Sequence, residues 1–223
     1  MKRYLPFAIV LVVALLAVGG GTWLYRTKSS FGGGAPQIKG KTAEQRGELA
    51  HTLGPANAPV TLEEFGDFQC PPCGTLSEPI NKLQKEFHSS LRVIFREFPL
   101  ANHAHAREAA CAAEAAGLQG RFWEMHDMLF REQAVWSNST DVRALLNTYA
   151  IYIGLDVGRF KADMDSDKVK ERVEADQKQG TSIGVKNTPT IFLNNRALPP
   201  QDLNPANLRS EVAEAVKAAK PSS

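Results

Sequence analysis

Cysteine is scarce in this sequence: the chain of 223 residues contains three. Three cysteines are too few for a scaffold held together by disulfides, so a hydrophobic core must stabilise the fold. They are also too few for the usual structural zinc site, which takes four ligands and commonly two cysteine pairs. The position of each cysteine in the fold therefore decides what it can do.

An excess of charge of one sign is also missing. The sequence has 26 Lys and Arg residues against 24 Asp and Glu residues, a net charge of +2. So small an excess predicts neither nucleic-acid binding nor a strongly acidic partner. No repeat period is evident, and the length fits one domain of ordinary size with a short appendage.

Charged residues are absent from the segment between Tyr4 and Tyr25, which is mostly apolar. At ~1.5 Å per helical residue it is long enough to cross a bilayer core of ~30 Å. Lys2 and Arg3 precede it, which favours a cytoplasmic N-terminus and an extracytoplasmic remainder. Residues 1–26 are therefore predicted to form a signal-anchor or transmembrane helix; a signal peptide cleaved at Ala17-Val18-Gly19, which would leave a soluble periplasmic protein, is the alternative.

The segment of residues 27–46 is rich in glycine and serine and predicts a flexible linker. We expect the folded domain to occupy residues 47–223. Anchored or released, this domain would lie in an oxidising compartment, where a disulfide can persist.

The stretch Phe65-Gly66-Asp67-Phe68-Gln69-Cys70-Pro71-Pro72-Cys73 places two cysteines between a strand and a helix. A β-rich, apolar run from Val60 to Phe65 precedes it. Apolar residues at helical spacing follow it. These are Leu76, Ile80, Leu83 and Phe87. The two prolines suit the first helical turn, whose N–H groups have no intrahelical partner.

A cysteine at the start of a helix has its thiolate stabilised by the helix dipole and by free N–H groups. Cys70 is therefore predicted to be the attacking nucleophile and Cys73 the resolving thiol of a redox-active disulfide. Since Pro71 and Pro72 lack N–H groups, we expect the Cys73 and Gly74 amides to be the donors to the thiolate. Half of a zinc site and an inert structural disulfide are the alternative interpretations.

The remaining pattern predicts a sheet interrupted by helices. Strands are expected at 60–65, 91–98, 190–193 and 196–198, with helices at 71–87 and from Pro205 onward. The first two strands should be parallel, since a helix connects them. Residues 103–182 are predicted to be helical throughout, with helices over 104–116 and 121–133. Three further helices are predicted to begin at the N-cap residues Ser139 or Thr140, Asp156 and Asp167.

This order of elements resembles a thioredoxin fold with an inserted all-helical block, an α/β architecture with a central mixed sheet flanked by helices. More specifically, the sequence resembles the DsbA-like family of extracytoplasmic thiol–disulfide oxidoreductases. The stretches that carry the resemblance are Ala58 to Leu62, Asp67 to Cys73, Phe98-Pro99-Leu100 with His103, Gln119 to Asp127, and Thr188 to Phe192.

The resemblance implies three further site residues. Pro189 matches the cis-proline that packs opposite the cysteine pair, and Thr188 matches the residue before it, which touches the active sulfurs. Glu64 matches a buried acid beneath the site and would accept the Cys73 proton; a strand carboxylate paired with a lysine is the alternative. Asn187 stands where family members often have glycine.

The resemblance implies a protein disulfide oxidoreductase that oxidises dithiols in reduced exported proteins. It would need no cofactor beyond the Cys70–Cys73 disulfide, no metal and no nucleic acid, and a membrane redox partner would reoxidise it. The family's best-studied oxidases have a histidine between the cysteines; its absence here predicts a weaker oxidant, with a moderately lowered pKa of Cys70. A reductase or isomerase with the same site, and a thioredoxin-like holdase or copper-binding module, are the alternatives.

Two other candidates are interpreted structurally. Cys111 lies among alanines in a predicted helix and is expected to be a small buried hydrophobe; a regulatory thiol is the alternative. His103 and His105 point in different directions on a helix, so we interpret His103 as part of a helix start rather than as a metal ligand.

Overall fold

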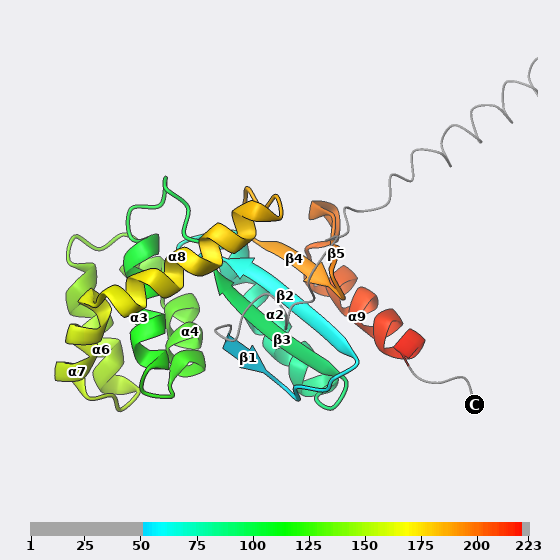
Figure 1. Ribbon diagram of the computed structural model, residues 1–223, viewed down its shortest axis with the longest axis horizontal. Helices are drawn as coiled ribbons and strands as arrows, with labels where there is room; N and C mark the ends of the chain where they lie inside the picture. The colour runs from blue at the N-terminus through cyan, green and yellow to red at the C-terminus, as the bar shows by residue number, and fades with distance from the viewer. Residues whose placement is uncertain (1–50, 220–223) are drawn as a thin grey trace, which may run out of the picture. The chain divides into compact units, whose positions relative to one another are not determined.

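The computed structural model describes residues 51–219 (Figure 1). The predicted membrane or signal helix (1–26) and the predicted linker (27–46) lie outside the described residues. Within residues 51–219, no helix is both long enough and apolar enough to cross a membrane.

A five-stranded mixed sheet forms the centre of residues 51–219 (Figure 1). Its order is β1-β3-β2-β4-β5, and the strands are β1 His51–Leu53, β2 Val60–Gly66, β3 Leu91–Glu97, β4 Thr190–Leu193 and β5 Arg196–Ala197. The predicted parallel pairing of β2 with β3 is confirmed, and the other pairs are antiparallel. β1, an edge strand of three residues, is too short to leave a periodic signal and was not predicted.

Two helices pack together over apolar side chains of the sheet: α2 Pro71–Glu86 and α9 Pro205–Ala219. The predicted apolar face of α2 is buried through Leu76, Ile80 and Leu83. These side chains share one cluster with strand and α9 residues, including Val60, Leu62, Val93, Ile191, Leu208 and Val212. Burial of this layer holds α2 in place and so fixes where its first turn lies.

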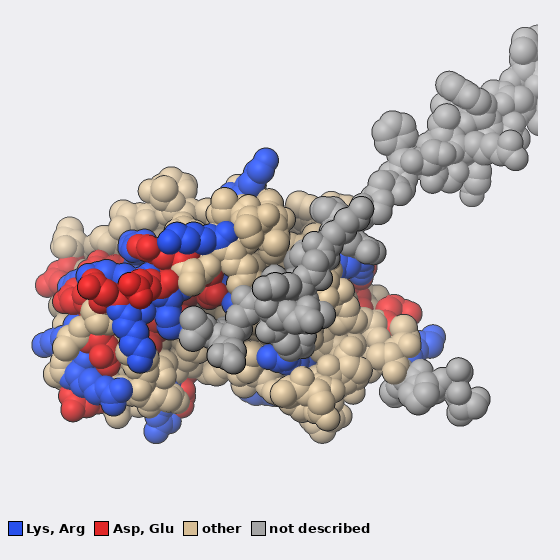
Figure 2. All heavy atoms as spheres, in the orientation of Figure 1, with Lys and Arg blue, Asp and Glu red and all other residues tan. Residues whose placement is uncertain are grey.

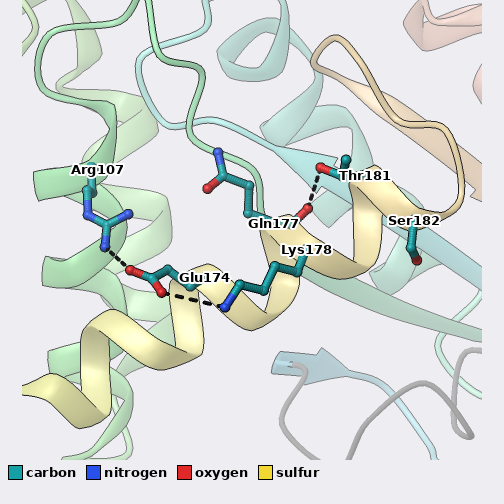
Figure 3. Close-up of a pocket in the computed structure, with 6 residues that line it drawn as sticks. All are labelled: Arg107, Glu174, Gln177, Lys178, Thr181 and Ser182. Atoms are coloured by element: carbon teal, nitrogen blue, oxygen red, sulfur yellow. Dashed lines mark hydrogen bonds and ion pairs between the residues drawn. The ribbon is translucent and has the colours of Figure 1, made fainter.

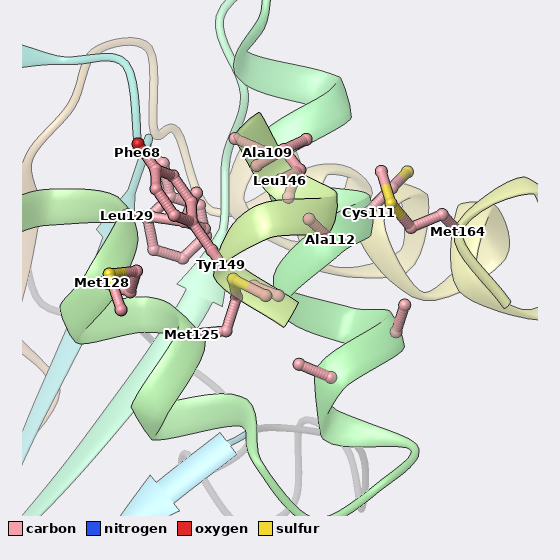
Figure 4. Packing of buried hydrophobic residues seen from close by; sticks show 14 of the residues in the cluster. Phe68, Ala109, Cys111, Ala112, Met125, Met128, Leu129, Leu146, Tyr149 and Met164 are labelled. Carbon is pink, nitrogen blue, oxygen red and sulfur yellow. The ribbon is translucent and has the colours of Figure 1, made fainter. Parts of the chain in front are cut away.

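A block of six helices separates β3 from β4. It consists of α3 Ala106–Gly117, α4 Phe122–Arg131, α5 Gln133–Trp136, α6 Val142–Tyr152, α7 Val157–Asp165 and α8 Asp167–Ser182. Its core forms around the alanines of α3, with Phe68 packed nearby (Figure 4). Cys70 and Cys73 belong to the same cluster. The segment around the two cysteines and the helical block therefore share one hydrophobic core. On the face of the block that Figure 2 shows, acidic and basic side chains lie intermixed.

The observed helices differ from prediction by one or two residues at the ends of α2 and α3, and more clearly in one division and two caps. Helix 121–133 is two helices, α4 and α5, that meet at Glu132. Asp141, not Ser139 or Thr140, caps α6 by accepting from the Ala144 N–H. Ser166 caps α8 instead of Asp167, because its hydroxyl lies one residue earlier and accepts from Val169 N–H; the predicted cap at Asp156 is confirmed.

Strand order, helix placement and the inserted block together give the predicted thioredoxin fold. The antiparallel register of β2 and β4 brings two segments that are distant in the sequence to the same end of the sheet. Phe65 lies opposite Thr190, so the end of β2 lies beside the beginning of β4. Cys70 comes shortly after Phe65 along the chain, and Pro189 directly precedes Thr190.

Candidate active site

The sheet brings Cys70 and the Thr188–Pro189 segment together, although more than a hundred residues separate them. The Thr188–Pro189 peptide bond is cis. The Cys70 sulfur lies 3.2 Å from the Thr188 carbonyl oxygen, to which it donates a hydrogen bond when it is protonated. The structure thus places Cys70, Thr188 and Pro189 in one site, as the resemblance implies; their roles in catalysis stay predictions.

The first turn of α2 exposes one side of the motif and buries the other. Cys70 occupies the N-cap position, and Pro71 and Pro72 begin the helix with exposed side chains. Cys73 is fully buried, while Cys70 is 4% exposed. An incoming thiol can therefore approach Cys70 but not Cys73.

Opposite shifts in pKa distinguish the two thiols. The pKa of Cys70 is lowered from 9.0 to about 6, chiefly by hydrogen bonding to the Cys73 thiol. Burial raises this pKa, and hydrogen bonds from the Thr188 side chain and the Cys73 backbone N–H lower it further. The Asp67 charge raises it. Burial raises the pKa of Cys73 far above its ordinary value. Cys70 is therefore mainly thiolate at neutral pH, and Cys73 is a thiol. The predicted Cys73 amide donor is present, but the Gly74 N–H bonds the Cys70 carbonyl instead, at 3.2 Å.

Glu64 lies in β2 with 3% of its surface exposed. Its Oε1 atom has no hydrogen-bond partner among residues 51–219. Burial, followed by the nearby Cys70 charge, raises the pKa of Glu64 to about 8. The Glu64 charge in turn contributes to the raised pKa of Cys73. The structure thus brings Glu64 close to both thiols.

Three polar residues around the cysteines were missed as site residues at the sequence level. The Gln133 amide donates to the carbonyls of Phe68 and Cys70, at 2.7 and 2.9 Å. Gln69 accepts from the His105 N–H at 2.7 Å, and Asp67 accepts from the Gln69 N–H at the same distance. Asp67 and Gln69 stand beside Cys70 in the sequence, so their position was a usable signal. Gln133 had none, because it is far away in the chain.

Cys111 lies outside this site. It is 6% exposed in the core of the helical block, and burial raises its pKa to about 11. Both observations agree with the interpretation of Cys111 as a small buried hydrophobe. His103 does not begin a helix, since α3 starts at Ala106; instead its imidazole pairs with Asp67 at 2.7 Å.

A groove of about 550 Å³ lies between α2 and α4, and no predicted site residue lines it. It starts at Gly74, one residue after Cys73, and its walls carry both basic and acidic side chains. Those lining it include Ser77, Glu78, Lys82, Lys85, Asp127 and Arg131. A second pocket, of about 600 Å³, lies along α8 and includes Arg107, Glu174 and Gln177 but no predicted site residue (Figure 3).

Paired cysteines at a helix start, opposite a cis-proline in this sheet order, define a class: thioredoxin-fold proteins with a two-cysteine site. The Thioredoxin family model matches residues 47–212. The chain belongs to this family.

Solved structures share this fold. BdbD from Bacillus subtilis is 24% identical, with a TM-score of 0.69 over 81% of this chain and 98% of that one. The thiol-disulfide exchange protein α-DsbA2 from Wolbachia pipientis is 19% identical, with a TM-score of 0.62 over 75% of this chain and 87% of that one. The predicted likeness to DsbA-like proteins is confirmed at the level of fold, including the helical block.

The curated relatives are much longer proteins. The Na(+)/H(+) antiporter NhaA 1 of Mycolicibacterium gilvum is 38% identical over 154 residues, which is 67% of this chain and 24% of that protein. The Na(+)/H(+) antiporter NhaA of Herminiimonas arsenicoxydans is 40% identical over 151 residues, 68% of this chain and 23% of that protein. The chain thus spans about a quarter of the length of the curated relatives it matches.

Proposed function

We propose that this protein is a thiol–disulfide oxidoreductase that forms disulfides in exported proteins. The observation that carries the proposal is the asymmetry of the two thiols. The pKa of Cys70 is lowered to about 6 at a nearly buried but approachable sulfur, and burial raises that of Cys73. A metal ligand pair or a structural disulfide has no need for such a difference, whereas disulfide exchange does.

The reaction begins with the Cys70–Cys73 disulfide. A substrate thiolate attacks the Cys70 sulfur, the enzyme disulfide breaks, and Cys73 leaves with the electron pair and takes up a proton. A second substrate thiolate then attacks the substrate sulfur of the mixed disulfide and releases Cys70 as a thiolate. Two electrons pass from two substrate thiols to the enzyme, and the substrate gains one disulfide.

Glu64 is proposed to carry the proton of Cys73. In the reduced enzyme, burial and then the Cys70 charge raise the pKa of Glu64 to about 8, so the carboxyl is mostly protonated. In the mixed disulfide the Cys70 charge is gone, and Glu64 then ionises more easily. Glu64 can thus donate the proton as Cys73 leaves and accept it in the reverse direction.

The direction of the reaction follows from the thiolate. A stabilised Cys70 thiolate favours the reduced enzyme and makes Cys70 a good leaving group, and both effects favour oxidation of substrates. A reductase or isomerase would use the same residues, with a partner that keeps the pair reduced. We place the domain outside the cytoplasm, tethered by residues 1–26 or released from them, with a membrane redox partner that reoxidises it.

The test is the equilibrium of the Cys70–Cys73 pair with glutathione. A reduction potential of about −120 to −180 mV would support oxidase or isomerase activity, and a potential of about −270 mV would support reductase activity. A Cys73→Ala variant should accumulate mixed disulfides with exported proteins, whereas Cys70→Ala, the matched control, should not. Tight stoichiometric binding of Cu(I) by the reduced protein, without such mixed disulfides, would favour a copper-binding module instead.

The antiporter relatives favour a second candidate role. A region similar to this domain forms part of proteins named as Na(+)/H(+) antiporters, so this domain could act on a membrane transporter rather than on exported proteins in general. This role predicts that the Cys73→Ala variant traps one membrane protein predominantly. Mass spectrometry of the trapped species separates the two roles.

A further inference from the structure

Asp67 is a charged residue of the motif, and its negative charge destabilises the Cys70 thiolate. It follows β2 directly, and its side chain is completely buried. Its backbone carbonyl accepts the Cys70 N–H at 3.0 Å, so the two residues share one turn. Among the influences on the pKa of Cys70, which the Cys73 thiol leads, the Asp67 charge raises it.

Three donors hold the Asp67 carboxylate. The Gln69 N–H bonds Oδ1 at 2.7 Å, the Leu100 N–H bonds Oδ2 at 2.8 Å, and His103 Nδ1 lies 2.7 Å from Oδ2. Because an ionised carboxylate only accepts hydrogen bonds, Nδ1 of His103 carries the proton of this contact. Of the three donors, His103 is the only side chain, so it is the one that a substitution can remove.

Backbone and side-chain hydrogen bonds of the surrounding loop hold His103 in this position. It belongs to the loop between β3 and α3, where its N–H bonds the Leu100 carbonyl at 3.0 Å. Gln177 of α8 fixes the same loop by donating to the Pro99 carbonyl at 2.8 Å. The imidazole is 21% exposed, so it lies between the buried carboxylate and solvent.

We propose that Asp67 and His103 form a pair that tunes the reactivity of Cys70: His103 shares the charge of the Asp67 carboxylate and so limits how strongly that carboxylate opposes the thiolate. His103 is a positioning residue in this scheme, since it acts through Asp67 and does not touch the sulfur. The inference rests on the proposed redox function, because only a reactive thiolate needs such tuning.

The proposal predicts opposite effects for the two members of the pair. His103→Ala leaves the Asp67 charge without its imidazole donor, so the acid dissociation constant of Cys70 should fall by about threefold or more, and the enzyme should become less oxidising. Asp67→Asn removes the opposing charge, so the same constant should rise. If the contact between Asp67 and His103 only stabilised the fold, both substitutions would change the acid dissociation constant of Cys70 in the same direction, or neither would change it.

The experiment measures two quantities in each variant: the pKa of Cys70, from thiolate absorbance against pH, and the equilibrium with glutathione. His103→Asn, which keeps an N–H donor near the place of Nδ1, should restore most of the wild-type values. His105→Ala is the matched control, because His105 bonds the Gln69 side chain through its backbone N–H, which alanine keeps. This control should leave both quantities unchanged.

The outcomes separate this inference from the proposed function. If wild-type Cys70 and Cys73 form no reversible disulfide, the redox function itself is wrong. If they do, but His103→Ala leaves the pKa of Cys70 unchanged or lowers it, the tuning pair is overturned. Should Asp67→Asn fail to fold, the comparison of His103→Ala, His103→Asn and His105→Ala decides alone, since all three keep Asp67.

Discussion

The side-chain amide of Gln133 donates hydrogen bonds to the carbonyls on either side of Gln69, and one of these is the carbonyl of Cys70, at 2.9 Å. Gln133 begins α5 in the helical block, whereas Cys70 ends the loop that leaves the central sheet. One amide group therefore fixes the backbone at the reactive sulfur to the inserted block.

Loss of this amide should weaken both the fold and the reaction. Gln133→Ala removes the hydrogen bond to the Phe68 carbonyl and leaves the Cys70 carbonyl with the Gly74 N–H alone, so the free energy of unfolding should fall by about 1–3 kcal/mol. The Cys70 loop becomes less well positioned, and its rate of exchange with a small disulfide should fall. Denaturant unfolding and stopped-flow kinetics measure the two effects. Gln119→Ala is the control: it also loses a bond to a backbone carbonyl, that of Asp156 in the helical block, and should slow exchange less. Equal slowing by both variants would contradict the special role of Gln133.

Gly74 is constrained by the same glutamine. A Cβ atom at Gly74 would lie 2.8 Å from Gln133 Oε1, so Gly74→Ala should push the amide aside and destabilise the protein. In a Gln133→Ala background the obstacle is absent, and alanine should stabilise α2 by up to ~1 kcal/mol because it favours the helix over glycine. A double-mutant cycle by denaturant unfolding checks this change of sign. Additive effects in the cycle would show that the two residues do not interact.

The Thr188 hydroxyl should support the Cys70 thiolate. Its Oγ1 atom is buried and has no hydrogen-bond partner within the described part of the chain, so the hydroxyl is available to the thiolate. Thr188→Val keeps the shape but removes the donor, so the pKa of Cys70 should rise from about 6 by about 1, and alkylation of Cys70 at pH 6 should slow. Thr188→Ser should behave as wild type. Thr148→Val, which removes an exposed hydroxyl on α6, serves as control. An unchanged pH profile in Thr188→Val would exclude the hydroxyl as a donor.

Replacement of Glu64 should change how stability depends on pH. In the reduced protein, the pKa of Glu64 is raised from 4.5 to about 8. Between these values the folded protein keeps a proton that the unfolded chain has released, so rising pH destabilises the fold by up to ~1.4 kcal/mol per pH unit. Glu64→Gln cannot ionise, so its advantage over wild type should grow across this window and stay constant above it.

Unfolding of the reduced proteins at several pH values tests the Glu64 prediction. Glu78→Gln is the control, because Glu78 is exposed on α2 and pairs with Lys82 there. It should show no growing advantage over the same range. A constant difference between Glu64→Gln and wild type would mean that Glu64 titrates as an ordinary carboxylate.

Cys111 should be chemically silent in the folded protein. Its burial and a pKa raised to about 11 leave almost no accessible thiolate at neutral pH. A maleimide reagent should therefore label Cys70 rapidly and Cys111 only after denaturation, and Cys111→Ala should leave the equilibrium with glutathione unchanged. Rapid native labelling of Cys111 would support the regulatory interpretation instead.

The sequence was sufficient for the parts of this structure that leave local patterns. The apolar period of α2 and the buried run of β2 follow from short-range rules, and they predicted the position of Cys70 between a strand and a helix. The place of Pro189 opposite the cysteines was implied by the resemblance to the DsbA-like family. β1 left no such pattern, since three edge residues cannot show a period. The contacts of Asp67 with His103, and of Cys70 with Gln133, join residues 36 and 63 positions apart. Such contacts depend on how the helical block packs, which no local pattern records.

The helix α8 reaches from the helical block to the sheet, since it packs against α3, α7 and β3, and a short loop joins its end to Thr188. Each added or deleted residue in a helix turns everything beyond it by about 100°. A change of length inside α8 would therefore swing the cis-proline segment away from Cys70. Natural insertions and deletions in the block should accumulate in its surface loops, while the length of α8 stays constant.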